Sequence, residues 1–361
     1  MSHVGIEDCI AATRALGRRR SRGRCAHWLG AIAFALGALL TLPSAGAQTV
    51  PAAQTRALRF RFVGPARGNR VAAAAGVPGD PNVYYAGASS GGVWKSSDGG
   101  FRWRPIFDRE PVQAIGALAV APSAHNQVWA GTGEAWLIRP SDMSGDGVYR
   151  SLDAGRTWEH MGLTNTGRIG RIVINPHDPN LVYVCALGHS AAAGPDRGVY
   201  RTTDGGKTWQ RVLFVAPDTG CSGLAMDPHD PEKLFAGFWE VTMRPWALDS
   251  GGPHSGIYVS TDGGSHWSRL AHDGLPHAPL GKIDVAIAPS DSNRVYALIE
   301  TKDQGSLWRS DNGGRNWRVV NWNRDLIGRA GYYIRLAVSP ADENTVYLSN
   351  SSFWISSDGG L

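Results

Sequence analysis

The chain has 361 residues, including 46 glycines and 14 tryptophans, and a formal net charge of +5. Its length allows one large domain or two ordinary ones. The many glycines and aromatic residues, without a long helical pattern, indicate an all-β protein with many turns. Residues 1–47 carry +4 of the net charge, so the remainder is nearly neutral and gives no electrostatic reason to expect nucleic-acid binding.

The first 47 residues have the pattern of a cleavable secretory signal peptide. An arginine-rich block at residues 18–24 precedes an apolar stretch over residues 28–42, and small residues follow at 45–47. An apolar run this short favours a signal peptide over a membrane anchor, which needs about 20 residues. We therefore predict a signal peptide over residues 1–47 and a short linker over residues 48–57. The mature protein is expected in the periplasm or outside the cell, without stable membrane insertion.

From residue 58 onward the motif Ser/Thr-x-Asp-x-Gly-x-x-Trp recurs at intervals of 46 to 58 residues. The acidic position of the motif is occupied by Asp98, Asp153, Asp204, Asp262, Asn312 and Asp358, and the last copy stops before its tryptophan. Each copy follows two apolar runs separated by a turn rich in Pro and Asp. Four short antiparallel strands in about 50 residues are typical of a propeller blade. A β-sandwich array is the alternative.

We therefore predict that residues 58–361 form an all-β propeller of about six four-stranded antiparallel blades. The last blade is expected to be truncated, and the ring open or poorly closed. The recurring aspartate has a structural explanation, because its carboxylate can accept backbone N–H groups inside a tight turn. Five aspartates and one asparagine at equivalent positions of six blade edges cannot converge on one catalytic or calcium site.

Cys185 and Cys221 remain after removal of the leader. Both lie in apolar, strand-like stretches, so we expect two small buried hydrophobic residues. Export would also permit a disulfide between them. The sequence leaves both alternatives open.

The motif resembles the Asp-box, or BNR, repeat of sialidases, xyloglucanases and sortilin-type propellers. Residues 64–70, 131–136 and 251–256 are similar to exported bacterial proteins that carry a sortilin N-terminal-like propeller and are often labelled glycosyl hydrolases. The resemblance covers about residues 58–361 and implies a fold more than a function. Xyloglucanase-like propellers place an acidic residue shortly before a Gly-Gly pair in an early blade, where this chain has Ser89-Ser90-Gly91-Gly92. The Arg-Ile-Pro-type motif of sialidases is also absent, so neither catalytic site transfers.

The loops after each second strand and the loops between blades should share one face. They vary in length, as binding loops do, and the longest cover residues 134–145, 187–197 and 238–255. We predict that this face binds its ligand through Arg168, Arg171, His189, Arg244, Trp246, Asp284, Arg329, Tyr332 and Arg335. Arg171, Asp284 and Arg335 begin inner strands. They are expected to face the central channel, either as an anion-binding mouth or as salt bridges between blades.

The first functional hypothesis is a binding or scaffold domain that holds a peptide or a glycan. The alternative is a glycoside hydrolase, which needs two carboxyl groups about 5 Å or 6.5–9.5 Å apart. Glu134 and Glu240 are the candidate catalytic carboxylates, although Glu134 could equally accept hydrogen bonds from neighbouring loops. No zinc, P-loop or dinucleotide motif appears, so we predict neither a metal nor a cofactor. The oligomeric state stays open.

Overall fold

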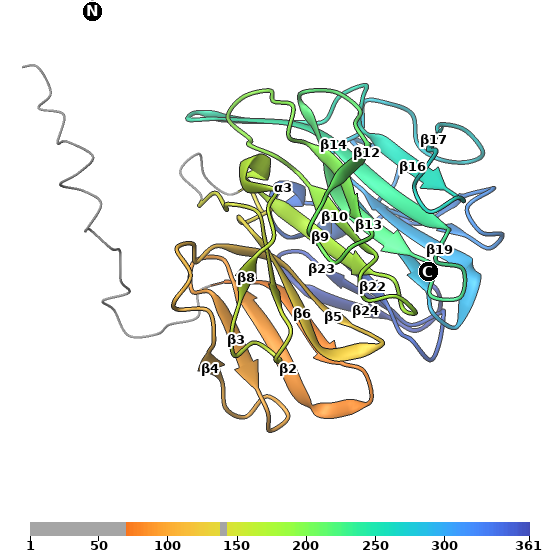
Figure 1. Ribbon diagram of the computed structural model, residues 1–361. Coiled ribbons are helices and arrows are strands. Elements are labelled where there is room, and N and C mark those ends of the chain that lie inside the picture. Colours follow the sequence, from red (N-terminus) through yellow and green to blue (C-terminus); the bar gives the residue numbers. More distant parts are fainter. Residues whose placement is uncertain (1–69, 138–142) are drawn as a thin grey trace, which may run out of the picture. The chain divides into compact units, whose positions relative to one another are not determined.

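The computed structural model describes residues 70–137 and 143–361. The predicted signal peptide, the linker and the first residues of the predicted propeller lie outside the described residues. By internal contacts the chain divides into Met1–Phe60 and Arg61–Leu361, and every described strand belongs to the second unit. The described residues form six antiparallel sheets, in which strands follow one another in chain order (Figure 1).

Each sheet corresponds to one copy of the repeat. The first contains β1 (Val71–Val77), β2 (Asp80–Ala88), β3 (Val93–Ser96) and β4 (Arg104–Pro105), and the second β5 (Ile115–Ala121), β6 (Ala124–Thr132), β7 (Val148–Ser151) and β8 (Glu159–His160). The third contains β9 (Ile169–Ile174), β10 (Val182–Ala186), β11 (Gly198–Thr202) and β12 (Gln210–Leu213), and the fourth β13 (Thr219–Met226), β14 (Leu234–Arg244), β16 (Gly256–Ser260) and β17 (Ser268–Leu270). The fifth contains β18 (Ile283–Ala288), β19 (Asp291–Ile299), β20 (Leu307–Ser310) and β21 (Arg318–Asn321). The sixth has β22 (Arg335–Val338), β23 (Val346–Ser349) and β24 (Phe353–Ser356).

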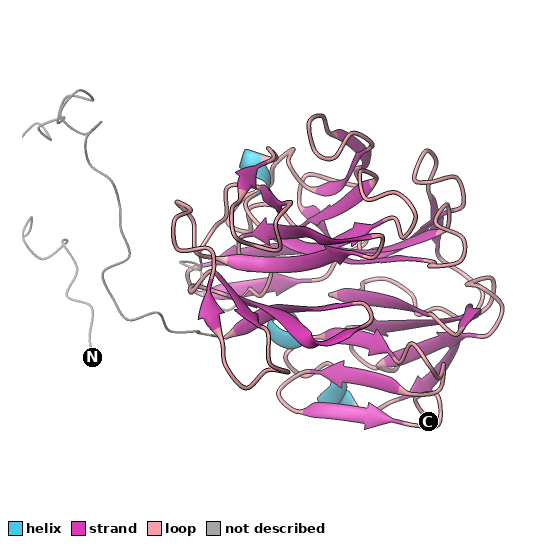
Figure 2. Cartoon of the chain, turned by 60° about the horizontal axis from the view of Figure 1, so that its bottom comes forward, coloured by secondary structure: helices cyan, strands magenta, loops and turns pink. Residues whose placement is uncertain are grey.

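The departures from four strands are local. In the fourth blade, β15 (Ala247–Ser250) pairs with the end of β14 and lengthens one hairpin. Within residues 70–137 and 143–361, the helical turns are the 3-10 helices Thr164–Thr166 and Arg324–Leu326 and the short α3 (Ala330–Tyr333). All three lie in connections between blades, and strands dominate the rest (Figure 2). The predicted all-β propeller of antiparallel blades is therefore confirmed.

The inner strands pack against one another in the order β1, β5, β9, β13, β18 and β22. This close approach requires small residues. A Cβ on Gly116 would collide with the carbonyl oxygens of Gly133 and Ile169, so only glycine lets the second and third blades meet there. Within the described strands, no sheet combines the first and the sixth blade. Among the strands that the structure describes, none therefore pairs the first blade with the sixth.

The Asp boxes close the hairpins between third and fourth strands. In the second blade, Asp153 Oδ1 accepts hydrogen bonds from the Ser151 hydroxyl (2.8 Å) and from the Thr157 backbone N–H (2.9 Å). Hydrogen bonding by the Thr157 hydroxyl, and then by its N–H, lowers the pKa of Asp153 to about 2. The Trp158 indole donates to a backbone carbonyl of the preceding blade. The carboxylate is thus occupied within its own turn.

The same hydroxyl bond recurs in all six boxes, where it joins the side chain of the Ser or Thr to that of the residue two positions later. Asn312 retains it, and its Oδ1 still accepts the backbone N–H of Asn316 at 2.9 Å. Replacement of the carboxylate by an amide therefore leaves the turn of the fifth blade intact.

Cys185 and Cys221 form a disulfide, which corrects the expectation of two separate buried hydrophobic residues. Cys185 lies on β10 and Cys221 on β13, so the bond joins the third blade to the fourth. Both residues are fully buried. The cross-link therefore adds a covalent tie to an interface otherwise held by packing.

Replacing both cysteines with alanine is expected to lower the free energy of unfolding by about 3–4 kcal/mol, because the bond closes a loop of 36 residues in the unfolded chain. Urea unfolding of the oxidised wild type, the reduced wild type and the double variant measures the effect. The reduced wild type should match the variant. A loss below about 1 kcal/mol in both would contradict the prediction.

Candidate functional site

The loops after second strands and the connections between blades lie on one side of the sheets and are hydrogen-bonded to each other. The N–H of Leu187 donates to the carbonyl of Arg168 at 2.9 Å, and the N–H of Val241 to that of Asp218 at 3.0 Å. We call this side, formed by the residues that follow second strands and precede inner strands, the loop face. It is the side on which the sequence placed the binding residues.

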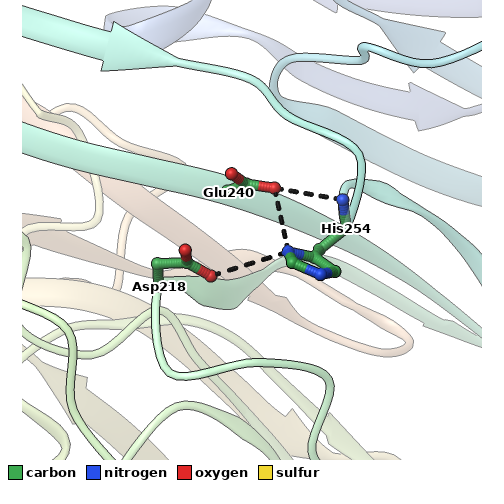
Figure 3. Close-up of side chains that lie close together, drawn as sticks. All are labelled: Asp218, Glu240 and His254. Atoms are coloured by element: carbon green, nitrogen blue, oxygen red, sulfur yellow. Dashed lines mark hydrogen bonds and ion pairs between the residues drawn. The ribbon is translucent and has the colours of Figure 1, made fainter.

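The loop face brings together two carboxylates and a histidine of the fourth blade: Asp218, Glu240 and His254 (Figure 3). His254 Nδ1 lies 3.2 Å from Glu240 Oε2 and 3.9 Å from Asp218 Oδ1, and the ligand atoms of all three residues lie within 4.8 Å of one another. The side chains are 40% (Asp218), 22% (Glu240) and 52% (His254) exposed. The two carboxylates thus face solvent at a separation short enough to act on one group.

Local contacts fix both carboxylates. The Thr219 hydroxyl donates to Asp218 Oδ1 at 2.9 Å, and the backbone N–H of His254 donates to Glu240 Oε2 at 3.0 Å. Any Cβ on Gly252 would overlap the Glu240 carboxyl group, so glycine is needed for that group to lie against the loop. The carboxyl pair is therefore held before any ligand arrives.

Arg197 stabilises this arrangement through hydrogen bonds to backbone carbonyls. The residue is 1% exposed, and its guanidinium donates to the carbonyls of Asp218 (2.6 Å), His189 (2.7 Å) and Val241 (3.3 Å). Burial lowers the pKa of Arg197 to about 10, and the nearby Asp218 opposes that shift. One buried cation thus ties together three segments of the loop face through their backbone carbonyls.

Glu134, a candidate catalytic residue, is engaged elsewhere. It is 2% exposed and accepts from Arg70 Nε at 3.1 Å and from Arg70 Nη2 at 2.7 Å. This two-point ion pair connects the start of β1 with the end of β6, and so joins the first two blades. A buried carboxylate held by an arginine is poorly placed to exchange a proton with a substrate. Ser89, in the stretch Ser89–Gly92 at the place that resembles the acidic position of xyloglucanase-like propellers, is also buried.

The residues predicted to face the central channel do meet across it. Arg171 of the third blade forms an ion pair of 2.6 Å with Asp284 of the fifth, and the Leu336 N–H of the sixth donates to the same carboxylate oxygen at 2.9 Å. Arg335 donates to the carbonyl of Gly170 at 3.1 Å. Both arginines also line a cavity of about 80 Å³. The Arg171–Asp284 pair is a salt bridge between blades, one of the two alternatives that the sequence left open, whereas Arg335 makes a hydrogen bond to a backbone carbonyl.

Burial lowers the pKa of Arg335 to about 9, and the positive charge of Arg171 adds to this effect, while Asp284 opposes it. Lys282, which the sequence did not single out, is 3% exposed and lies with its Nζ 5.3 Å from the centre of the Trp239 ring. Burial, followed by the charge of Arg335, lowers its pKa to about 7. The charges of Asp284 and Glu300 oppose this fall, and Glu300 Oε2 also accepts the backbone N–H of Lys282 at 2.9 Å.

The other candidates make contacts of their own. Arg244 forms an exposed ion pair of 2.9 Å with Asp249 at the β14–β15 hairpin, whose tip carries Trp246, 80% exposed. Arg329 lies over the ring of Tyr332 at 5.8 Å. His189 is exposed, and its carbonyl is held by Arg197.

Sequence reasoning found Glu240 but missed Asp218 and His254. Asp218 comes from a connection between blades and His254 from a long hairpin loop, and neither belongs to the repeat. The glycine pair before His254, residues 251–252, was the available signal, because a lone Gly-Gly-Pro-His turn inside a long loop marks a close backbone approach.

Three comparisons place the chain among known proteins. The family described as "Sortilin, neurotensin receptor 3" matches residues 146–303. A xyloglucanase of Acetivibrio thermocellus is 29% identical over 274 residues, which are 66% of this chain and 30% of that protein. A xyloglucanase of Paenibacillus sp. is 25% identical over 273 residues, 67% of this chain and 25% of that one. The chain spans only 25–31% of the length of the first curated relatives it matches.

Solved structures agree on the fold. The GH74 xyloglucanase of Xanthomonas campestris superimposes with a TM-score of 0.60 at 18% identity, over 80% of this chain and 45% of that one. A structure titled "YCF48 bound to D1 peptide" gives 0.51 at 17% identity, over 80% of both chains. The chain is therefore an Asp-box β-propeller protein with a sortilin-like sequence over residues 146–303.

Proposed function

We propose that this protein is a glycoside hydrolase of the propeller type, which binds a xyloglucan-like glycan on the loop face. Asp218 and Glu240 are its carboxyl pair. The observation that carries the proposal is the approach of these two partly exposed carboxylates to within 4.8 Å. This is close to the separation of about 5–5.5 Å that a retaining glycosidase uses. The curated relatives named xyloglucanases support the substrate class.

The hydrogen bonds suggest a role for each carboxylate. Glu240 Oε2 accepts the backbone N–H of His254 at 3.0 Å, and His254 Nδ1, which is a second donor when it carries a proton, lies 3.2 Å away. Donors of this kind stabilise an anionic oxygen, which suits the nucleophile of a retaining mechanism. Asp218, the more exposed of the two, is then the acid that protonates the leaving oxygen and later deprotonates the attacking water.

The test is release of reducing ends from xyloglucan and from unsubstituted β-glucans. Asp218→Asn should lower the rate by about 10²–10⁴-fold, the usual contribution of a catalytic acid or base. Glu240→Gln removes the nucleophile and should lower the rate at least as much. Asp249→Asn is the matched control, because it removes an exposed carboxylate of the same blade that pairs only with Arg244 among the described residues. Its rate should match the wild type.

A binding-only function is the second candidate. The stretch Ser89–Gly92 favours it, because it contains no acidic residue at the place that resembles the acidic position of xyloglucanase-like propellers. If the wild type binds xyloglucan without releasing reducing ends, the hydrolase proposal is overturned and glycan binding remains. If it binds neither xyloglucan nor β-glucans but captures an extended peptide, the scaffold hypothesis replaces both.

The protein is proposed to act after export. The disulfide between Cys185 and Cys221 fits an oxidising compartment such as the periplasm or the extracellular space. Among the residues that the structure describes, no helix is long and apolar enough to span a bilayer. The alkylation state of the two cysteines in protein recovered from the native compartment tests this placement.

A further inference from the structure

A cavity of about 660 Å³ lies between the outer strand of the first blade and the Asp box of the second. Its charged lining consists of Lys95, Arg104, Arg109, Arg156, Asp108 and Glu110. We call it the basic groove. It shares no lining residue with the carboxyl pair of the loop face, so a ligand bound in the groove would be independent of the proposed hydrolase activity.

Three of the cations crowd one another. Lys95 on β3 lies directly opposite Arg104 on β4, and like charges in opposed positions of a sheet repel. Burial lowers the pKa of Lys95, and the charges of Arg104 and Arg156 lower it further, while Asp153 opposes them. Within residues 70–137 and 143–361, none of these three cations has a carboxylate within 4.0 Å.

Other blades balance the cation at the position of Lys95. In the second blade Arg150 faces Glu159 across the sheet and forms an ion pair of 2.9 Å with it. In the third, Arg201 faces Gln210 and donates to its side-chain oxygen at 3.0 Å. In both blades an acceptor occupies the position where the first blade has Arg104.

The fifth blade repeats the arrangement of two opposed cations, and there the structure holds the missing anion. Arg309 lies opposite Arg318, and the carboxylate of Asp311 lies 3.1 Å from the first and 3.3 Å from the second. Asp311 follows the serine of its Asp box, and the equivalent residue of the first blade is Ser97. In the fifth blade a carboxylate therefore lies between the two opposed arginines. In the first blade the equivalent position has no carboxylate.

We propose that the basic groove is a binding site for a carboxylate-bearing polysaccharide, such as a chain of uronic acids, with one carboxylate between Lys95 and Arg104 and near Arg156. A sugar presents an apolar ring face beside its carboxylate. The groove offers the matching surface, because Ile106 and Trp158 line it together with the cations.

An acidic peptide fits this groove less well. A peptide usually binds at a blade edge by extending the sheet through backbone hydrogen bonds. Here the edge strand β4 has only two residues, and one is Pro105, which has no N–H to donate. The acidic residues of the lining do not fill the cation pair either, because among the described residues neither Asp108 nor Glu110 forms an ion pair with Lys95, Arg104 or Arg156.

The test is titration calorimetry of the protein with oligogalacturonate. The variant Arg104→Gln/Arg156→Gln should bind at least about tenfold more weakly, the equivalent of losing about 1.4 kcal/mol of charge-assisted contacts. Ser97→Asp should bind as weakly, because it supplies the internal carboxylate of the fifth blade, and it should melt no lower than the wild type. Arg315→Gln is the matched control, since Arg315 occupies the position of Arg156 in the fifth box. It should bind like the wild type.

Each other outcome overturns the proposal. If the wild type gives no heat with oligogalacturonate, the groove is not a binding site for it. If all variants bind with equal affinity, the ligand binds outside the groove. If polyglutamate binds as tightly as oligogalacturonate or more tightly, the ligand of the groove is an acidic peptide and not a glycan. If dextran sulfate binds and oligogalacturonate does not, the groove recognises sulfate groups and not carboxylates. Melting curves of every variant separate a loss of binding from a loss of fold.

Discussion

Replacing Lys282 with methionine is expected to stabilise the protein at pH 6 and to have little effect near pH 10. Lys282 is buried and its pKa falls to about 7 in the folded protein, from the ordinary 10.5. Between these values the unfolded chain binds the proton and the folded protein does not, so the stability of the wild type rises with pH. Below pH 7 the full cost of the buried charge remains, at most about 5 kcal/mol. Methionine has no charge to bury and keeps the length of the side chain.

Urea unfolding at pH 6, 8 and 9.5 measures this effect. The difference between Lys282→Met and the wild type should shrink steadily as the pH rises. Lys302→Met, at an exposed position of the same blade, is the control and should show no such trend. A difference of equal size at all three pH values would mean that packing against Trp239, and not the buried charge, sets the stability of this position.

Replacing Asp284 with asparagine is expected to lower the free energy of unfolding by about 3–5 kcal/mol, the cost of leaving buried charges without their partner. Asp284 is fully buried, and it is ion-paired with Arg171 at 2.6 Å. Its negative charge also opposes the falls in pKa of Arg335 and Lys282. Asparagine keeps an oxygen for the Leu336 N–H, so the variant removes the charge and little else.

Urea unfolding at pH 7 measures the loss. Asp249→Asn removes an exposed carboxylate of an ion pair and should cost less than about 1 kcal/mol. Adding Lys282→Met to Asp284→Asn should recover part of the loss, because it removes one of the charges left unbalanced. If Asp284→Asn stays within about 1 kcal/mol of the wild type, water or another anion solvates the channel and the network contributes little.

The central channel bears on stability. Its arginines and Lys282 lie near the charges of Asp284 and Glu300, and the contacts of Arg171, Arg335 and Asp284 join the third, fifth and sixth blades. Such a network holds inner strands in register, so loss of Asp284 should affect unfolding.

The repeat by itself determined the architecture. Each Asp box is held by hydrogen bonds between residues close in sequence, such as those of Asp153 with Ser151 and Thr157. The motif recurs once in every blade. Hydrogen bonds this close in sequence leave a pattern that can be read without knowing the fold. The same holds for the apolar runs that become the inner strands.

The tertiary structure alone decided the site. Asp218, Glu240 and His254 lie in a connection, a strand and a hairpin loop, and they meet only after the fourth blade has paired. The disulfide of Cys185 and Cys221, the ion pair of Glu134 with Arg70, and the burial of Lys282 likewise depend on contacts between blades. Local hydrogen bonds and periodic burial leave patterns in neighbouring residues, so they can be predicted from the sequence. Ion pairs and the carboxyl pair join residues that are distant in sequence and meet only in the folded chain.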